Sequence, residues 1–153
     1  MSVSIDNAWD EAEKTVFREL ATSLNSKEGA DAFRGYLPVS RLDVWMFSSG
    51  GGTNGIERIW NVDKAPCFAT IATDCNFTCL SATRSGAMQW AGKVLKFLQD
   101  TTNMYHRGNV ATVRIQSYPV EPDVMVLDEK SGIIGWTVNI PAELVYITTD
   151  TWN

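Results

Sequence analysis

Histidine and cysteine, on which much enzymatic and metal chemistry depends, are scarce in this chain of 153 residues. His106 is the only histidine, and it lies in a polar stretch far along the chain from Cys67, Cys75 and Cys79. Zinc sites need closely spaced Cys or His ligands, and a serine or cysteine nucleophile needs a nearby base. The sequence therefore predicts no catalytic residues and no metal site, and we expect the three cysteines to be free thiols.

Long apolar runs and basic clusters are also missing. No stretch approaches the roughly 18 apolar residues that a membrane-spanning helix needs. The N-terminal segment MSVSIDNAWDEAEK lacks the basic start and apolar block of a secretory signal. The 13 lysines and arginines are scattered and the net charge is −5, whereas proteins that grip DNA by its phosphates carry a basic patch. We therefore expect a cytosolic protein that neither enters a membrane nor binds DNA tightly.

Two segments show the periodicity of amphipathic helices. In the first, 4–24, apolar residues recur on one face and carboxylates gather near the start, where the helix dipole favours negative charge. In the second, 83–99, polar residues at helical spacing leave a wide apolar arc between them. This arc predicts a helix packed deep against a sheet, with Ser81 or Thr83 as its N-cap.

Short apolar or alternating segments between and after these helices predict strands. The predicted strands are Leu42–Phe47, Ile56–Val62, Cys67–Thr73, Val110–Tyr118, Val124–Leu127 and Trp136–Thr148. We expect 74–81 to bridge to the second helix and 101–109 to be a polar connection. The resulting order predicts a single α+β domain over 1–153, with a mostly antiparallel sheet and two principal helices packed on it.

Two residues within this pattern have predictable local roles. Pro141 cannot donate a backbone hydrogen bond to a neighbouring strand, so it is expected to mark a bulge, a break or an edge position. Gly132 ends the turn sequence Asp-Glu-Lys-Ser-Gly and is expected to take a positive φ in a hairpin.

A glycine-rich stretch, SSGGGTNG, runs from Ser48 to Gly55. Consecutive glycines lose much backbone entropy on ordering, which predicts a flexible loop at about 48–55. A phosphate-binding loop would need Gly-Lys-Ser/Thr followed by a helix, but Ile56 and Glu57 follow here and begin a predicted strand. We therefore expect no cofactor and interpret the stretch as a surface loop that orders on assembly. Residues 150–153 are expected to form a loose tail.

Six tryptophans are more than a small core requires. Four of them fit core positions, namely Trp9, Trp60, Trp90 and Trp136. Trp45, beside the glycine loop, and Trp152, in the tail, are harder to bury within one subunit. Because interfaces are enriched in aromatic residues, a self-associating surface is one hypothesis, and ordinary partial burial is the other. The candidate assembly site comprises Trp45, Ser48, Gly50, Gly51, Gly52, Thr53, Asn54 and Trp152.

Three segments also occur in an order that matches a known family. They are the helix AMQWAGKVLKFLQ, the strand VATVRIQSYPVEPDV and the closing strand GWTVNIPAELVYIT. A proline follows the middle strand, and the last segment contains Trp-x-Val-x-Ile-Pro-x-Glu-Leu. This arrangement, over about residues 65–149, resembles the tail terminator proteins of long-tailed bacteriophages. The segment 36–62, with its glycine loop, has no counterpart in the pattern.

The resemblance implies a structural protein without enzymatic activity that forms a homo-oligomeric ring, usually a hexamer. Such a ring caps the tail tube, stops polymerisation of the tube protein and gives the head-tail connector a docking surface, while DNA passes through the lumen without specific binding. The protein would occupy the host cytoplasm during assembly and the virion tail or neck afterwards. Two alternatives stay open: another neck or tail protein (a head-closure or tube protein), and a small-molecule-binding module or enzyme.

Overall fold

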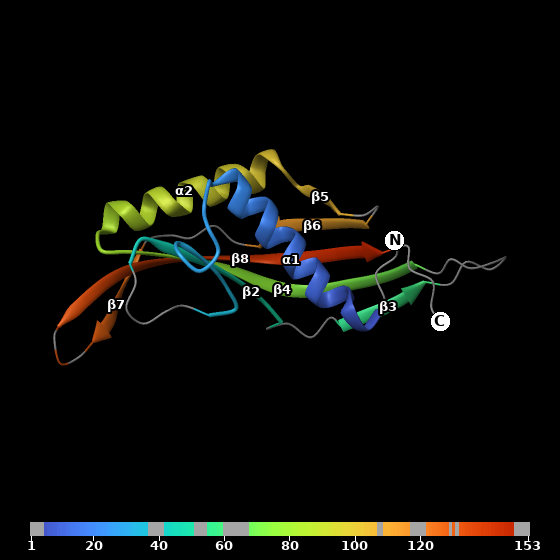
Figure 1. The fold of residues 1–153 in the computed structure, drawn as a ribbon, viewed down its shortest axis with the longest axis horizontal. Helices are drawn as coiled ribbons and strands as arrows, with labels where there is room; N and C mark the ends of the chain where they lie inside the picture. Colours follow the sequence, from blue (N-terminus) through green and yellow to red (C-terminus); the bar gives the residue numbers. More distant parts are fainter. Residues whose placement is uncertain are drawn as a thin grey trace.

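The computed structural model describes residues 5–36, 42–50, 55–59, 68–106, 109–116, 122–128, 130 and 132–148. These residues form two helices and one eight-stranded sheet. The elements are α1 (Ile5–Ser23), β1 (Ala32–Arg34), β2 (Val44–Ser49), β3 (Gly55–Ile59), β4 (Phe68–Ser81), α2 (Arg84–Asp100), β5 (Asn103–His106), β6 (Asn109–Ile115), β7 (Asp123–Asp128) and β8 (Ile133–Thr148). Both helices lie on the same side of a curved sheet (Figure 1), so the prediction of a single α+β domain is confirmed.

The sheet is organised around its two longest strands, β4 and β8. They pair in antiparallel fashion from Ala69 opposite Thr148 to Ser81 opposite Trp136. The main strand order is β1-β2-β4-β8-β6-β5. On its edge away from β8, β4 pairs with both β2 and β3. On its edge away from β4, β8 pairs with both β6 and β7. Among these pairings only β1 with β2 is parallel, which confirms the mostly antiparallel sheet.

The helix boundaries follow from their capping residues. Thr83 accepts a hydrogen bond from the backbone N–H of Gly86 at 3.0 Å and caps α2, as one of the two predicted candidates. At the end of α1, Asn25 takes φ 53°, and the N–H of Ser26 donates to the carbonyl of Ala21 at 2.8 Å. This left-handed residue after the last turn satisfies carbonyl groups that the helix leaves unpaired.

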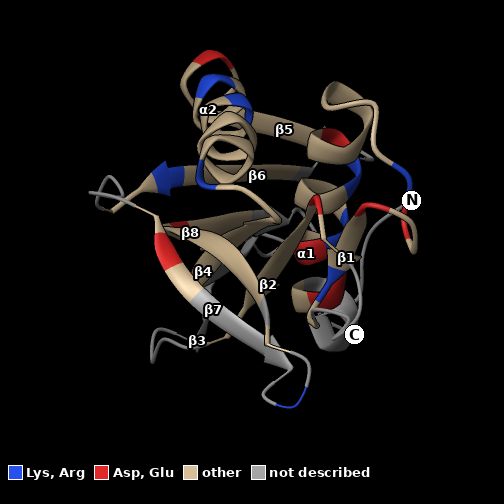
Figure 2. Ribbon diagram, turned by 90° about the vertical axis from the view of Figure 1, so that its left-hand side faces the viewer, with Lys and Arg blue, Asp and Glu red and all other residues tan. Residues whose placement is uncertain are grey.

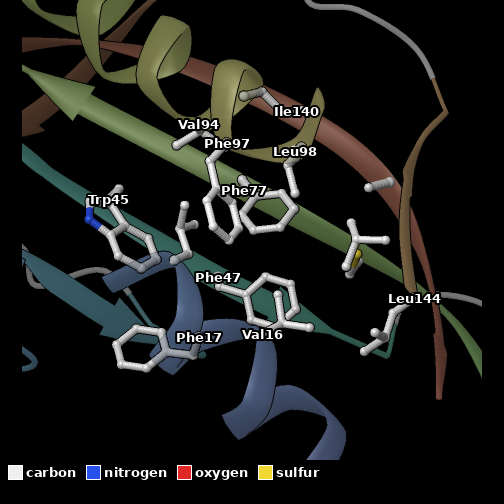
Figure 3. Packing of buried hydrophobic residues seen from close by; sticks show 14 of the residues in the cluster. Val16, Phe17, Trp45, Phe47, Phe77, Val94, Phe97, Leu98, Ile140 and Leu144 are labelled. Atoms are coloured by element: carbon white, nitrogen blue, oxygen red, sulfur yellow. The ribbon is translucent and has the colours of Figure 1, made fainter. Parts of the chain in front are cut away.

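The core lies between the helices and one face of the sheet. Side chains of α1, α2, β2 and β4 converge there, with the rings of Phe47 and Phe77 4.8 Å apart and those of Phe17 and Trp45 5.3 Å apart (Figure 3). The buried residues of α2 are Ala87, Ala91, Val94, Phe97 and Leu98. Their spacing places them on one helical face, so the predicted deep packing of this helix is confirmed. Neither helix among the described residues is long and apolar enough to cross a membrane.

The predicted connection at 74–81 is wrong, because this segment continues β4. Its inward positions are apolar and buried, including Cys75, Phe77 and Cys79. The outward residues Asn76 and Thr78 are polar and bond across the sheet, since Thr78 Oγ1 donates to Asn139 Oδ1 at 2.8 Å. The predicted polar connection at 101–109 is also wrong in part, because it contains β5.

Pro141 interrupts a ladder, as predicted. The N–H of Gln116 donates to the carbonyl of Pro141 at 3.0 Å, but the reciprocal bond cannot form because proline has no N–H. The residues of β8 that pair with β6 end at Ala142, and those that pair with β7 begin at Thr137. The proline thus falls where β8 changes its outer partner. Gly132 takes φ 68° before β8, which confirms the positive φ predicted for the turn.

Candidate functional site

The glycine-rich stretch starts where β2 ends, and its first glycine is firmly placed. Gly50 has φ 105° and donates its N–H to the carbonyl of Asp74 on β4 at 3.0 Å. The indole of Trp9 from α1 lies against it, so that a Cβ on Gly50 would stand 2.7 Å from Cζ2 of Trp9. Both the left-handed backbone and the close approach require glycine here.

Trp9 also joins α1 to the last residue of β2 through hydrogen bonds. Its Nε1 donates to Ser49 Oγ at 3.0 Å, and Ser49 Oγ in turn donates to the carboxylate of Glu13. Trp9 is 45% exposed, so its predicted place in the core is wrong. Its ring instead covers the start of the glycine-rich stretch.

Ion pairs continue this network toward β1. Arg34 Nη1 lies 2.8 Å from Asp10 Oδ1 and 3.4 Å from Glu13 Oε1, and Lys14 Nζ lies 2.8 Å from Asp10 Oδ2. Hydrogen bonds from Lys14 and Arg34 lower the pKa of Asp10. Partial burial is the largest single effect on the pKa of Arg34 and lowers it, but the hydrogen bond to Asp10 together with the negative charges of Asp10, Glu13 and Glu28 outweighs burial and raises the pKa. The network fixes α1 to the edge of the sheet.

The structure describes three residues of the candidate assembly site, and a role of the site in assembly stays a prediction. Ser48 is half-buried opposite Asn76, and Gly50 lies close by in the chain. Trp45 is fully buried with 0% exposure, and its Nε1 donates to Ser26 Oγ at 2.9 Å. Its predicted role at an interface is therefore wrong, because β2 turns this ring into the core. Five predicted site residues lie outside the described residues, namely Gly51, Gly52, Thr53, Asn54 and Trp152.

A second surface, which the sequence pattern does not predict, is the hairpin of β7 and β8. Val124 is 53% exposed and Ile134 is 51% exposed. The register pairs Val124 with Trp136, and Ile134 precedes Trp136 by two residues on β8. The side chains of Val124 and Ile134 therefore share the face of β8 that carries the buried core residues farther along. The hairpin extends beyond the N-terminal end of α2 (Figure 1), and this explains why two apolar residues on the helix side stay exposed.

A third feature is a groove of about 450 Å³ between the C-terminal ends of the two helices. Its lining residues are Ser23, Leu24, Lys93, Lys96, Phe97, Asp100 and Thr101. Leu24 is half-buried, Phe97 is buried, and both lysines are exposed. Lys93 Nζ lies 4.9 Å from the ring centroid of Trp90, a distance typical of cation–π contacts. Basic residues are visible along α2 in Figure 2.

The described cysteines are poorly suited to chemistry. Cys75 and Cys79 are free and buried, and burial raises the pKa of each thiol to about 12. Both are therefore protonated near neutral pH, where the thiolate is the reactive form. Within the described ranges, no group of three His, Cys, Asp or Glu residues could hold a metal ion. Cys67 lies outside those ranges.

These features define a small α+β domain with a protruding apolar hairpin and a basic groove. Such sheet-and-helix domains serve many unrelated functions, so the fold alone assigns none. No protein-family model matches the chain, and no curated protein matches it either.

Proposed function

We propose that this chain is a tail terminator protein of a long-tailed bacteriophage. The three segments that resemble the family form one continuous part of the fold. Helix α2 packs on β4 and β8, and β6 pairs with β8 along its outer edge. The resemblance therefore concerns a contiguous structural unit, which supports the proposal more strongly than three separate likenesses would.

The observation that carries the proposal is the exposed apolar hairpin. Val124 and Ile134 are both about half exposed on a hairpin that extends past α2. Burying the remaining apolar surface of such side chains contributes roughly 1 kcal/mol each. Exposed apolar groups gathered on a protruding element are typical of protein–protein contacts. A ring-forming protein needs such a surface on every subunit.

In this role the protein is structural and has no enzymatic activity. A homo-oligomeric ring, a hexamer by the resemblance, caps the finished tail tube and ends polymerisation of the tube protein. The opposite face of the ring receives the head-tail connector. The net charge of −5 disfavours tight binding of phosphates, so DNA passes through the lumen without specific contacts. Assembly takes place in the host cytoplasm, and the ring remains in the virion tail or neck.

The direct test is a tube-capping assay. Purified chain is added to a polymerising tail tube protein, and tube lengths and ends are measured by negative-stain electron microscopy. A terminator shortens the tubes in proportion to its concentration and leaves a ring at one end. A tube protein would add to the tubes and lengthen them instead. Tubes that grow normally, without rings at their ends, would contradict the proposal.

A further inference from the structure

The hairpin of β7 and β8 and the groove between the helix ends complement each other in apolar character and in charge. We propose that the hairpin of one copy inserts into the groove of a second copy, so that subunits join head to tail. This inference rests on the proposed ring and names the surfaces that build it.

The hairpin supplies an apolar and acidic surface. Val124 and Ile134 are exposed on its helix-side face, and the exposed Asp123 begins β7. In the sequence, the segment 121–130 contains four carboxylates and one lysine. The protruding element thus carries an exposed carboxylate, Asp123, beside two apolar residues that are about half exposed.

The groove supplies the opposite character. Leu24 is half-buried and contributes apolar surface, while Lys93 and Lys96 contribute two positive charges at exposed positions. Asp100 also lines the groove and reduces this charge by one. The net charge of these three groove residues stays positive. Opposite charges across an interface favour the correct orientation and speed association.

The two surfaces lie too far apart to meet within one chain. Ser81 pairs with Trp136 at the base of the hairpin, and α2 begins shortly afterwards at Arg84. The hairpin therefore lies beside the N-terminal end of α2, and the groove lies at its other end. A helix of 17 residues is about 25 Å long, so each copy offers a hairpin to one neighbour and a groove to another.

This arrangement is a heterologous contact, in which two different surfaces meet. Repetition of a heterologous contact closes into a ring when the rotation per subunit allows it, and otherwise produces a filament. A ring is the outcome that the proposed function requires. Because the paired charges are exposed, salt should weaken the contact.

The first experiment reverses the charge of the groove. Lys93→Glu with Lys96→Glu should weaken self-association of the full chain by roughly tenfold or more, because the hairpin would then meet like charges. Arg18→Glu with Arg114→Glu changes net charge equally at exposed positions outside the groove, and it should leave association within about twofold of the wild type. Light scattering across concentration measures both, with circular dichroism to confirm folding.

The second experiment traps the contact between copies, in a background with Cys67→Ser. A chain with Ile134→Cys is mixed with a chain carrying Lys96→Cys under mild oxidation. A disulfide-linked dimer should form in this mixture and in neither chain alone. Gln89→Cys, at an exposed position in the N-terminal half of the same helix, replaces Lys96→Cys as the control and should give no dimer.

The outcomes separate this inference from the proposed function. Equal association of the groove variant and the wild type, or equal cross-linking of both mixtures, overturns the head-to-tail contact and leaves a ring possible through other surfaces. If the groove variant forms normal rings that no longer bind tubes, the head-to-tail contact is also overturned, because the groove would then receive the tube protein. A wild-type chain that caps no tubes overturns the proposed function, whatever the cross-linking shows.

Discussion

Gly50 lies directly against the indole ring of Trp9, although 40 residues separate the two along the chain. A Cβ on Gly50 would stand 2.7 Å from Cζ2 of that ring, and the φ of Gly50 is 105°. The contact fixes where the glycine-rich stretch leaves β2, and it does so from the first half of α1.

Replacing Gly50 by alanine should therefore destabilise the protein. The positive φ and the clash with Trp9 together are expected to cost about 1–3 kcal/mol of unfolding free energy, measured by urea denaturation. In a Trp9→Ala background the same replacement should cost less, because the clash is gone. An equal cost in both backgrounds would contradict the contact.

Gly92 offers a matched control for this replacement. It lies on the exposed face of α2, and an added Cβ there meets no atom within 4 Å. Gly92→Ala should stabilise the protein by about 0.5–1 kcal/mol, because alanine favours the helix. A loss of stability in this variant would show that the helix face is covered in a way the structure does not describe.

Trp45 should behave as a core residue and not as an interface residue. It is fully buried, contacts the ring of Phe17 and donates to Ser26. Trp45→Ala is expected to lower the unfolding free energy by about 3–5 kcal/mol, measured by denaturation. A conservative Trp45→Phe variant should fold and self-associate as the wild type does. Weakened association of this folded variant would restore Trp45 as an assembly residue.

The ion pairs of Asp10 predict a contribution to acid stability. Its folded pKa is lowered from the ordinary 3.8, chiefly by the hydrogen bond from Lys14. The stabilisation is therefore present above about pH 4 and is lost as the pH falls through the lowered folded value. Asp10→Asn should reduce stability near pH 6 and flatten its decline below pH 4. Because Asp10 is largely exposed, the effect should shrink in high salt.

A control for net charge is available on the same helix. Glu19 is exposed on α1, and Glu19→Gln changes net charge by the same amount as Asp10→Asn. Urea unfolding from pH 2 to 7 compares the two variants. Identical curves for both would show that net charge, and not the pairs with Lys14 and Arg34, sets the acid response.

The thiols of Cys75 and Cys79 should resist alkylation in the folded protein. Burial raises the pKa of both to about 12, so little thiolate exists at pH 8 and reagents cannot reach it. Peptide mass spectrometry after iodoacetamide treatment should show labelling at these positions only when denaturant unfolds the chain. Rapid labelling in native buffer would contradict the position of β4 in the core.

The parts of the fold that follow a strong local period could be predicted from sequence. Helix α2 was expected at 83–99 and spans Arg84–Asp100, because its apolar residues recur at helical spacing. The sequence does not predict the second half of β4, because the outward residues Asn76 and Thr78 are polar, as is typical of a loop. Asn76 and Thr78 nevertheless fit a strand, because both form hydrogen bonds to Asn139 on β8, more than 60 residues away in the chain.

The candidate site was harder to predict because burial depends on which distant elements meet. Trp9 lies on the apolar stripe of α1 and was expected in the core, but its Nε1 binds Ser49 at the surface. Trp45 stands near the glycine-rich stretch, yet β2 points it inward toward Phe17. The exposure of Val124 and Ile134 depends on how far the hairpin extends beyond α2, which no local pattern reveals.

The most direct test of the account is the solution mass of the full chain, measured by light scattering across concentration, with and without tail tube protein. Ring assembly predicts a mass that rises toward about six chains, either with concentration or on contact with tube ends. A chain that stays monomeric at every concentration and ignores the tubes would contradict it.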